Sequence, residues 1–234
     1  MVNAFKEKLK RDEVVIVLNP DHPSPSLTEF IAGLGVDGVF IDCEHGVASV
    51  ERAQDMCRAA RVAGIQSIVR PETDAPFLIA RYLDAGAGGV IVPHVDTAAA
   101  ARRIVEAVRY TRPRDHEDKV IVVMIESLTA IENLSEMLTV EGVDVFFIGP
   151  NDLSHSMGHP AQMHHPEVKA MVKTVSAKIR AASRTPGTLV TSETTAEFAA
   201  AGCRFLYEHA NNLLIAGAAD FQRRLREGGT ERSP

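Results

Sequence analysis

Phe146-Phe147-Ile148-Gly149-Pro150-Asn151-Asp152-Leu153-Ser154 is the most informative stretch of this chain. Its apolar start is typical of a fully buried strand, and Gly-Pro ends that strand shortly before the carboxylate of Asp152. An earlier apolar run at residues 120–125 leads directly into Glu126. Two buried strands, each followed by one carboxylate, predict a site for a hard cation at the mouth of a parallel barrel.

Short apolar runs alternate with amphipathic segments along the whole chain, and the runs are continuous, as in parallel strands covered on both faces. Strands are expected at residues 14–18, 38–41, 67–69, 88–92, 120–125, 143–148, 188–190 and 205–207. Helices are expected at residues 26–32, 49–63, 75–84, 97–109, 128–138, 167–182, 193–201 and 212–225. The pattern predicts an α/β fold of the (β/α)8 TIM-barrel type. An open doubly wound sheet would need a glycine-rich loop where Asn19-Pro20-Asp21-His22 stands.

Length and composition narrow the class of protein. The 234 residues suit one barrel domain, assigned here to residues 1–226, and residues 227–234 have the composition of a disordered tail. A net charge of -6 without a basic run argues against a nucleic-acid partner. The sequence has no apolar run long enough for a membrane span and no signal peptide at its start.

The chain has three cysteines, Cys43, Cys57 and Cys203, without CxxC spacing. This usage favours free thiols and a cytoplasmic location. Cys43 stands between two acidic residues and has the context of a metal ligand or nucleophile, but a small buried thiol is the commoner case.

Polar side chains follow the predicted strands at their carboxyl ends, which is where the active site of a barrel lies. They are Asp42, Glu44, His45, Arg70, Glu126 and Asp152. Glu126 and Asp152 supply oxygen ligands of the kind that Mg²⁺ or Mn²⁺ prefers, with Co²⁺ as a further option. The alternative is that both carboxylates are N-caps or first-turn residues of the helices that follow them, where they satisfy free backbone N–H groups.

Arg70 and His45 are the other two chemical candidates. The planar guanidinium of Arg70 fits a substrate carboxylate with two hydrogen bonds, and the alternative role is an ion pair between loops. His45 is the acid–base candidate, and Asp42, three residues earlier, is expected to accept a hydrogen bond from its ring. Asp84 lies near the end of a predicted helix, where a solvated surface residue is the simplest interpretation.

Four histidines, His155, His159, His164 and His165, crowd the segment after the strand 143–148. Their spacing matches no standard zinc finger and no cysteine lies near. A loop over the active site therefore competes with a zinc site as their interpretation.

Five motifs, in this order, resemble the HpcH/HpaI family of class II, metal-dependent pyruvate aldolases. They are Phe40-Ile41-Asp42-Cys43-Glu44-His45-Gly46, Val69-Arg70-Pro71, Gly86-Ala87-Gly88-Gly89-Val90-Ile91-Val92-Pro93, Ile125-Glu126-Ser127 and Phe147-Ile148-Gly149-Pro150-Asn151-Asp152-Leu153-Ser154-His155-Ser156-Met157-Gly158. The similarity runs from about Phe5 to the last helix. It implies a barrel of the phosphoenolpyruvate/pyruvate type and a lyase acting on 4-hydroxy-2-oxo acids.

The resemblance also implies roles for particular residues. Glu126 and Asp152 would hold a divalent cation that chelates pyruvate, Arg70 would stabilise the enolate oxygen, and backbone N–H groups near Asn151 would receive the carboxylate. His45 with Asp42 would move the proton through a water on the cation. Asp84 matches a family position that reaches into a neighbouring subunit's site, in a homo-oligomer, usually a hexamer, whose last helix packs across subunits.

Departures from the family pattern concern the end of the site that would take the aldehyde. The connection at residues 110–119 is shorter than in typical members, which carry an Arg-Gly element there. Met124 stands where many relatives have Gln, and Tyr207-Glu208-His209-Ala210-Asn211-Asn212 is polar where relatives tend to be small and apolar.

The leading interpretation is an aldolase that joins pyruvate to an aldehyde or cleaves the product. The same enolate chemistry allows decarboxylation of oxaloacetate or cleavage of an acyl-CoA, although no basic cluster for a CoA phosphate is present. A third interpretation is a barrel that binds a metabolite without turning it over. Strand ends carry no lysine for a Schiff base, which disfavours the metal-independent aldolase mechanism.

Overall fold

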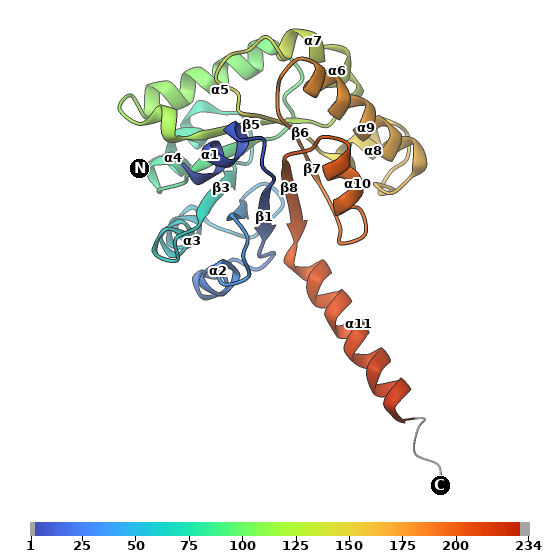
Figure 1. The fold of residues 1–234 in the computed structure, drawn as a ribbon. Helices are drawn as coiled ribbons and strands as arrows, with labels where there is room; N and C mark the ends of the chain where they lie inside the picture. The colour runs from blue at the N-terminus through green and yellow to red at the C-terminus, as the bar shows by residue number, and fades with distance from the viewer. Residues whose placement is uncertain (1–2, 230–234) are drawn as a thin grey trace.

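A computed structural model describes residues 3–229 of the chain. Within that part, eight parallel strands close into a barrel in the order β1 to β8, with β8 pairing back onto β1 (Figure 1). The strands are β1 (Val15–Asn19), β2 (Gly38–Asp42), β3 (Gln66–Arg70), β4 (Gly89–Val92), β5 (Val120–Ile125), β6 (Val145–Ile148), β7 (Pro186–Leu189) and β8 (Phe205–His209). The predicted (β/α)8 barrel is confirmed.

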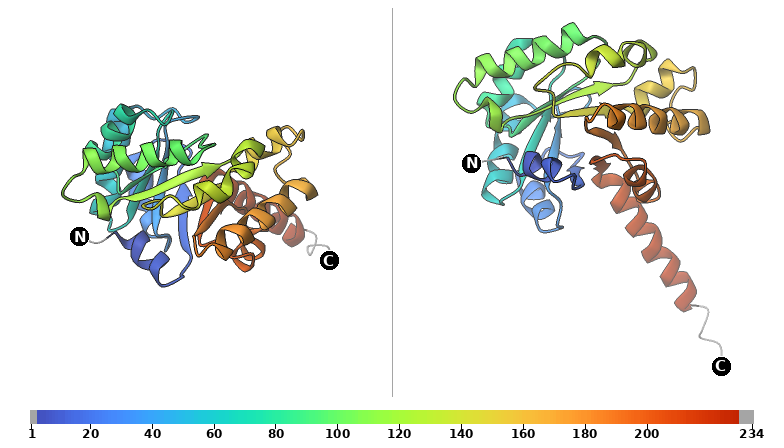
Figure 2. Two further views of the ribbon diagram at one scale, coloured as in Figure 1. Left: turned by 90° about the horizontal axis from the view of Figure 1, so that it is seen from above. Right: turned by 45° about the horizontal axis from the view of Figure 1, so that its top comes forward.

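Helices pack around the barrel, except for the last one, which projects away from it, as the two further views show (Figure 2). They are α1 (Ala4–Lys10), α2 (Pro25–Ala32), α3 (Val50–Val62), α4 (Pro76–Asp84), α5 (Ala98–Thr111), α6 (Leu128–Glu132), α7 (Leu134–Met137), α8 (Pro150–Ser156), α9 (Pro166–Ala181), α10 (Thr195–Ala200) and α11 (Ala210–Gly229), with a short 3-10 helix, η1, at His116–Asp118. The predicted helix at residues 128–138 is split at Asn133, whose side-chain amide donates to the Asp96 carbonyl oxygen. Helices α1 and α8 were not predicted.

The core has a layer inside the barrel and a layer between the barrel and its helices. Inside, Phe5 from α1 packs edge-on against Phe205, with ring centroids 5.8 Å apart, and closes the amino-terminal end of the barrel. Outside, the apolar faces of α5 and α9 bury Ile104 and Val172 against the strands. Side chains fill the barrel interior at its amino-terminal end. An active site is therefore expected at the carboxyl ends of the strands.

Strand register brings polar residues that are distant in sequence side by side at the carboxyl ends. Asp42 of β2 lies opposite Arg70 of β3. Asn19 of β1 lies opposite His209 of β8. The connection at residues 110–119 instead joins α5 to the start of β5, so it lies at the opposite end of the barrel. The barrel therefore separates this short connection from the mouth of its own chain.

Helix α11 leaves the barrel and extends away from it (Figure 1). It continues through Gly229, so the tail predicted at residues 227–234 is corrected for residues 227–229, and residues 230–234 lie outside the described part. Among the described helices, none combines the length and apolar character that a membrane span requires. The three cysteines are buried free thiols.

Candidate active site

A cavity of about 300 Å³ opens at the carboxyl ends of the strands. Its walls contain Asp42, His45, Arg70, Asn151 and Asp152, which the sequence places after three different strands. The barrel thus brings most of the predicted site residues together around one space. Glu126 lies just behind this wall, next to Gly149.

Glu126 follows β5 and is almost completely buried, with 3% of its surface exposed. It does not cap the next helix, because Ser127 does so by accepting the Ala130 N–H at 2.9 Å. Its Oε1 accepts the backbone N–H of His94 at 2.6 Å, while its Oε2 is buried without a hydrogen-bond partner among the described residues. The helix-capping alternative therefore does not apply to Glu126.

Burial raises the pKa of Glu126 to about 7. The His94 N–H and ring act in the opposite direction, and the negative charges of Asp152 and Glu44 add to the increase. A carboxylate held this way gains most from a nearby positive charge, because burial penalises its ionised form.

Asp152 lies in the first turn of α8, a helix that the sequence did not reveal, and it lines the cavity. Gly149 lies against Glu126, because a Cβ built there would lie 2.6 Å from Glu126 Oε2. The buried oxygen without a partner, the space left by the missing side chain beside it and the nearby negative charge of Asp152 fit a divalent cation bound by oxygen ligands.

Arg70 is buried and held by two carboxylates. Its Nε and Nη2 donate to the two oxygens of Asp42 at 2.9 and 2.6 Å, and its Nη1 lies 3.0 Å from Glu44 Oε2. The guanidinium also lies 5.5 Å from the centroid of the Phe40 ring. A guanidinium has five N–H groups and the hydrogen bonds to Asp42 use two of them, so N–H groups remain for a molecule bound in the cavity that Arg70 lines. Both predicted roles, the ion pair and the anion contact, are therefore compatible with its geometry.

Asp42 does not orient His45, which corrects the sequence interpretation. Burial alone would raise the pKa of Asp42, but the hydrogen bonds and charge of Arg70 and two backbone N–H groups hold it below its ordinary value. Those N–H groups belong to Glu44 and His45, at 3.0 and 3.2 Å. The His45 side chain is 64% exposed, with Glu44 Oε2 3.8 Å from its Nε2.

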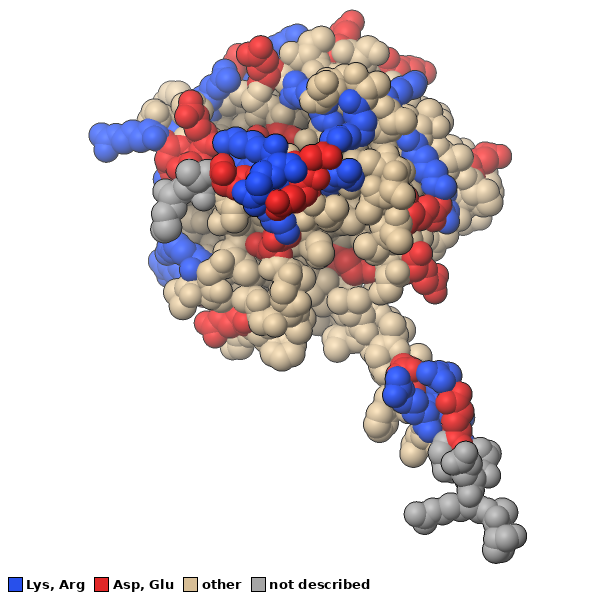
Figure 3. Space-filling view, viewed as in Figure 1, with Lys and Arg blue, Asp and Glu red and all other residues tan. Residues whose placement is uncertain are grey.

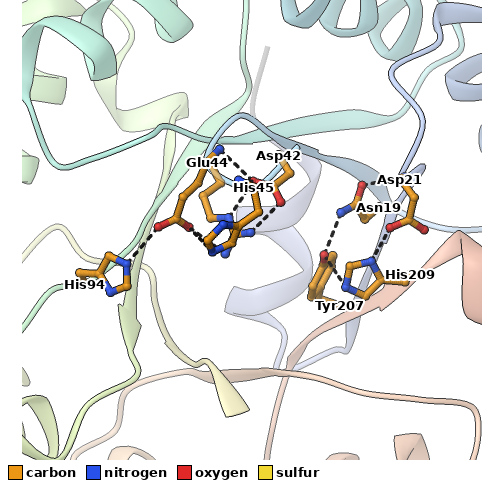
Figure 4. Close-up of polar contacts among 9 residues, drawn as sticks. Asn19, Asp21, Asp42, Glu44, His45, His94, Tyr207 and His209 are labelled. Carbon is orange, nitrogen blue, oxygen red and sulfur yellow. Dashed lines mark hydrogen bonds and ion pairs between the residues drawn. The ribbon is translucent and has the colours of Figure 1, made fainter. Parts of the chain in front are cut away.

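His94 is a site residue that sequence reasoning missed. It follows β4 and adopts a positive φ of 54°, which is uncommon for a residue other than glycine. Its ring nitrogens lie 3.0 Å from Glu44 Oε1 and from Glu126 Oε1, so it joins the two acidic residues. Figure 4 shows its contact with Glu44. The available signal was a histidine directly after Pro93 at the end of a predicted strand.

Neither Asp84 nor the histidines of residues 155–165 line the cavity, although Met163 of that segment packs against the inner core cluster that includes Met124 and Tyr207. Asp84 ends α4 with 67% of its side chain exposed, and its Oδ1 lies 3.6 Å from Arg112 Nη1. It therefore does not join the site of its own barrel. In the histidine-rich segment, His159, His165 and Glu167 bring one potential ligand atom each within 4.8 Å of one another.

A second polar group lies at the mouth, on β1, β8 and the loop after β1 (Figure 4). It consists of Asn19, Asp21, Tyr207 and His209. These residues line the first cavity or a neighbouring one of about 210 Å³. The sequence marked residues 207–212 as unusually polar, but their connection to Asn19 and Asp21 depends on closure of the barrel.

Comparison with known proteins identifies the family of this chain. The profile of the HpcH/HpaI aldolase/citrate lyase family matches residues 18–209. A 2-keto-3-deoxy-L-rhamnonate aldolase of Escherichia coli strain K12 is 33% identical over 242 residues, which cover 93% of this chain and 91% of that protein. An aldolase with the same name from Escherichia coli O17:K52:H18 is 32% identical over 244 residues, covering 94% and 91%.

Solved structures give the same result. An HpcH/HpaI aldolase/citrate lyase family protein from Burkholderia cenocepacia J2315 is 25% identical, with a TM-score of 0.87 and coverage of 96% of this chain and 100% of that one. The citrate synthase SbnG is 28% identical, with a TM-score of 0.85 and coverage of 97% and 98%.

The fold and the matched sequence define a carbon–carbon lyase, and the chain belongs to the HpcH/HpaI aldolase/citrate lyase family. This confirms the resemblance seen in the sequence. The interpretation as a barrel without catalytic activity is therefore set aside.

Proposed function

We propose that this enzyme is a divalent-cation-dependent aldolase that cleaves or forms the C3–C4 bond of a 4-hydroxy-2-oxo acid through a pyruvate enolate. The observation that carries the proposal is the buried Glu126, whose Oε2 has no partner among the described residues and faces Gly149 beside Asp152. The aldolase names of the relatives support the reaction class.

Glu126 and Asp152 are the residues proposed to hold the cation, with Mg²⁺ or Mn²⁺ as the expected metals because all the ligands are oxygens. When bound, the cation supplies positive charge for the enolate oxygen that develops as the bond breaks. Met124, which replaces a polar residue of many relatives, lines the same cavity and leaves the ligand set to these two carboxylates and the substrate.

The other residues of the cavity are proposed to bind and orient pyruvate. Arg70 presents N–H groups that its hydrogen bonds to Asp42 do not use, and the first turn of α8 offers the backbone N–H groups of Asn151 and Asp152 to the carboxylate. His45, exposed at the mouth, is proposed to exchange a proton with the methyl carbon of pyruvate.

A second candidate function uses the same pyruvate enolate but a different reaction partner in place of the aldehyde. The citrate synthase SbnG among the structural neighbours favours it, because that protein has nearly the same fold and is 28% identical. In this alternative the carbon of the enolate reacts with a 2-oxo acid or an acyl group. The enolate could also be formed by decarboxylation of oxaloacetate.

We also propose a homo-oligomer in which α11 packs on a second copy. Helix α11 exposes Leu214, Ile215 and Phe221 and lies away from its own barrel, with charged residues gathered toward its far end (Figure 3). An apolar hollow of about 170 Å³ lies on the outside of β1 and β8, lined by Ile16 and Leu206. In such an assembly Asp84 would be free to approach a neighbour's site, and a hexamer is the expected size.

The proposed function is tested by measuring pyruvate release from 4-hydroxy-2-oxopentanoate with added Mg²⁺ or Mn²⁺ and after chelation. Glu126→Ala and Asp152→Ala should each abolish the cation-dependent turnover, whereas Glu132→Ala, at an exposed carboxylate on α6, should leave it unchanged. Full activity in either site variant would refute the assignment of the cation site.

A further inference from the structure

Two cavities meet at the mouth of the barrel, and their shared wall is small. The cavity of about 300 Å³ contains Arg70 and Asp152, and the neighbouring cavity of about 210 Å³ lies over the loop after β1. The lining residues common to both are Phe40, Asp42, His45 and His209. If pyruvate occupies the first cavity and the aldehyde the second, the C3 carbon of pyruvate and the aldehyde carbon meet at this junction.

Formation or cleavage of that bond requires a proton to move at the aldehyde oxygen. Phe40 has no exchangeable proton, and Asp42 is already engaged by Arg70 and two backbone N–H groups. The remaining groups at the junction are the imidazoles of His45 and His209. Only His209 is held by a carboxylate within hydrogen-bond distance: its Nδ1 lies 2.5 Å from Asp21 Oδ1.

His209 is the centre of a continuous chain of hydrogen bonds (Figure 4). Asn19 Nδ2 donates to the Tyr207 hydroxyl at 2.9 Å, and that hydroxyl lies 3.0 Å from His209 Nε2. Asp21 is fixed in turn, because its Oδ2 accepts the Asn211 N–H at 2.8 Å and its N–H donates to Asn19 Oδ1 at 2.9 Å. The side chains of Asp21 and His209 are 12% and 30% exposed, so the chain is mostly shielded from water.

With one hydrogen on the His209 ring, the donors and acceptors allow one consistent direction. The amide nitrogen of Asn19 can only donate, so the Tyr207 oxygen accepts from it and has its own hydrogen for His209 Nε2. His209 Nδ1 then carries the hydrogen donated to Asp21. Tyr207 and His209 both line the cavity of about 300 Å³. A proton that leaves Tyr207 for Nε2 can therefore be replaced from a molecule bound there.

We propose that Tyr207 and His209 form a proton relay for the aldehyde oxygen, with Asp21 as the residue that positions His209. The inference rests on the proposed aldolase function. In cleavage, the substrate 4-hydroxyl gives its proton to the Tyr207 oxygen while the Tyr207 proton moves to His209 Nε2. The oxygen electron pair forms the aldehyde C=O bond, and the C3–C4 bonding pair passes to pyruvate as the enolate. Condensation reverses these transfers.

Asp21 suits the ion pair that this step creates, because the imidazolium formed at His209 faces its carboxylate. Arg70, Asp42 and Asp21 are the charged groups that act on Tyr207, and burial is the main cause of its raised pKa. Tyr207 is therefore suited to pass a proton on while remaining neutral itself. The relay serves the aldehyde oxygen, whereas His45 serves the methyl carbon of pyruvate.

This separation of roles gives a direct test with two measurements on each variant. One is cation-dependent hydrogen–deuterium exchange at the pyruvate methyl group, and the other is condensation of pyruvate with glycolaldehyde. The variants are Tyr207→Phe, His209→Gln and Asp21→Asn, the last chosen because asparagine tolerates the positive φ of 61° at that position. His164→Gln, at an exposed histidine of the segment after α8, is the matched control.

We expect Tyr207→Phe and His209→Gln to lower kcat for condensation by about 10²- to 10⁴-fold and to leave methyl exchange within about threefold of the unmodified enzyme. Equal loss of both activities would overturn the proposal, because the network would then only brace the site. Unchanged condensation in these variants would overturn the proposal as well. It would also be overturned if the unmodified enzyme exchanged the methyl hydrogens of pyruvate but did not condense pyruvate with glycolaldehyde. Absence of exchange in the unmodified enzyme would instead refute the proposed function.

Discussion

Glu126→Gln should change the pH dependence of stability in the cation-free protein. Burial raises the pKa of Glu126 from 4.5 to about 7, so the folded protein binds this proton more tightly than the unfolded chain. The free energy of unfolding therefore falls as the pH rises through this range, which is the opposite of a carboxylate held by an ion pair. Glutamine stays neutral and should remove that loss while keeping an oxygen for the His94 N–H.

The size of the effect follows from linkage. At about 1.4 kcal/mol for each pKa unit, a shift from 4.5 to about 7 makes the unfolding free energy fall by about 2 to 3 kcal/mol between pH 5 and pH 8. Titrating groups that do not interact with Glu126 are common to both proteins and cancel when the variant is compared with the unmodified enzyme, whereas the interaction of Glu126 with His94, Asp152 and Glu44 is part of the measured difference. The substitution also changes the unfolding free energy by an amount that does not depend on pH. That amount is the same at pH 5 and pH 8, so it cancels from the difference between them.

The assay is urea unfolding at pH 5 and pH 8 with a chelator, at one protein concentration. The unmodified enzyme should lose about 2 to 3 kcal/mol more than Glu126→Gln over this interval, and Mg²⁺ at pH 8 should stabilise the unmodified enzyme more than the variant. The same pH dependence in both proteins would refute the reasoning, since Glu126 would then not be a buried carboxylate in need of a counter-charge.

Three further predictions follow from the same structure. Gly149→Ala should abolish the response of activity to Mg²⁺, because the added Cβ would lie 2.6 Å from Glu126 Oε2. The backbone itself tolerates the change, since a φ of −86° suits alanine. An unchanged Mg²⁺ concentration for half-maximal activity would contradict this prediction. Arg70→Lys should lower kcat/KM for pyruvate release by about 10²-fold or more, because an ammonium cannot span Asp42 and Glu44 as the guanidinium does, and a loss below threefold would refute a role in substrate binding. Leu214→Glu on α11 should reduce the mass measured by light scattering, and a monomeric unmodified enzyme would contradict the proposed assembly.

The barrel could be predicted from the sequence because most of its strands are short apolar runs that end in glycine, proline or a charged residue. The run at residues 120–125 coincides with β5, and Glu126 and Asp152 follow their strands at the mouth as expected. These features are local, so a single sequence contains them. Helix α8 was missed because Gly-Pro and a histidine-rich segment look like a loop, although proline is favoured in the first turn of a helix.

Side-chain contacts between residues on different strands could not be predicted from the sequence. Asp42 and His45 are three residues apart, which suggested a contact, but the tight turn after β2 directs the Asp42 carboxylate to backbone N–H groups and to Arg70 opposite on β3. At Gly46 this turn leaves no room for a side chain, since a Cβ would lie 2.2 Å from the Asp42 carbonyl oxygen. The contact of His209 with Asp21 depends in the same way on closure of β8 onto β1.

The most direct test of the account is hydrogen–deuterium exchange at the pyruvate methyl group, followed by NMR with added Mg²⁺ or Mn²⁺ and again after chelation. It requires no knowledge of the aldehyde. We predict exchange that depends on the cation and disappears with the chelator or in Asp152→Ala. Exchange that persists without a cation, or no exchange with either metal, would contradict a cation-dependent pyruvate enolate at Glu126 and Asp152.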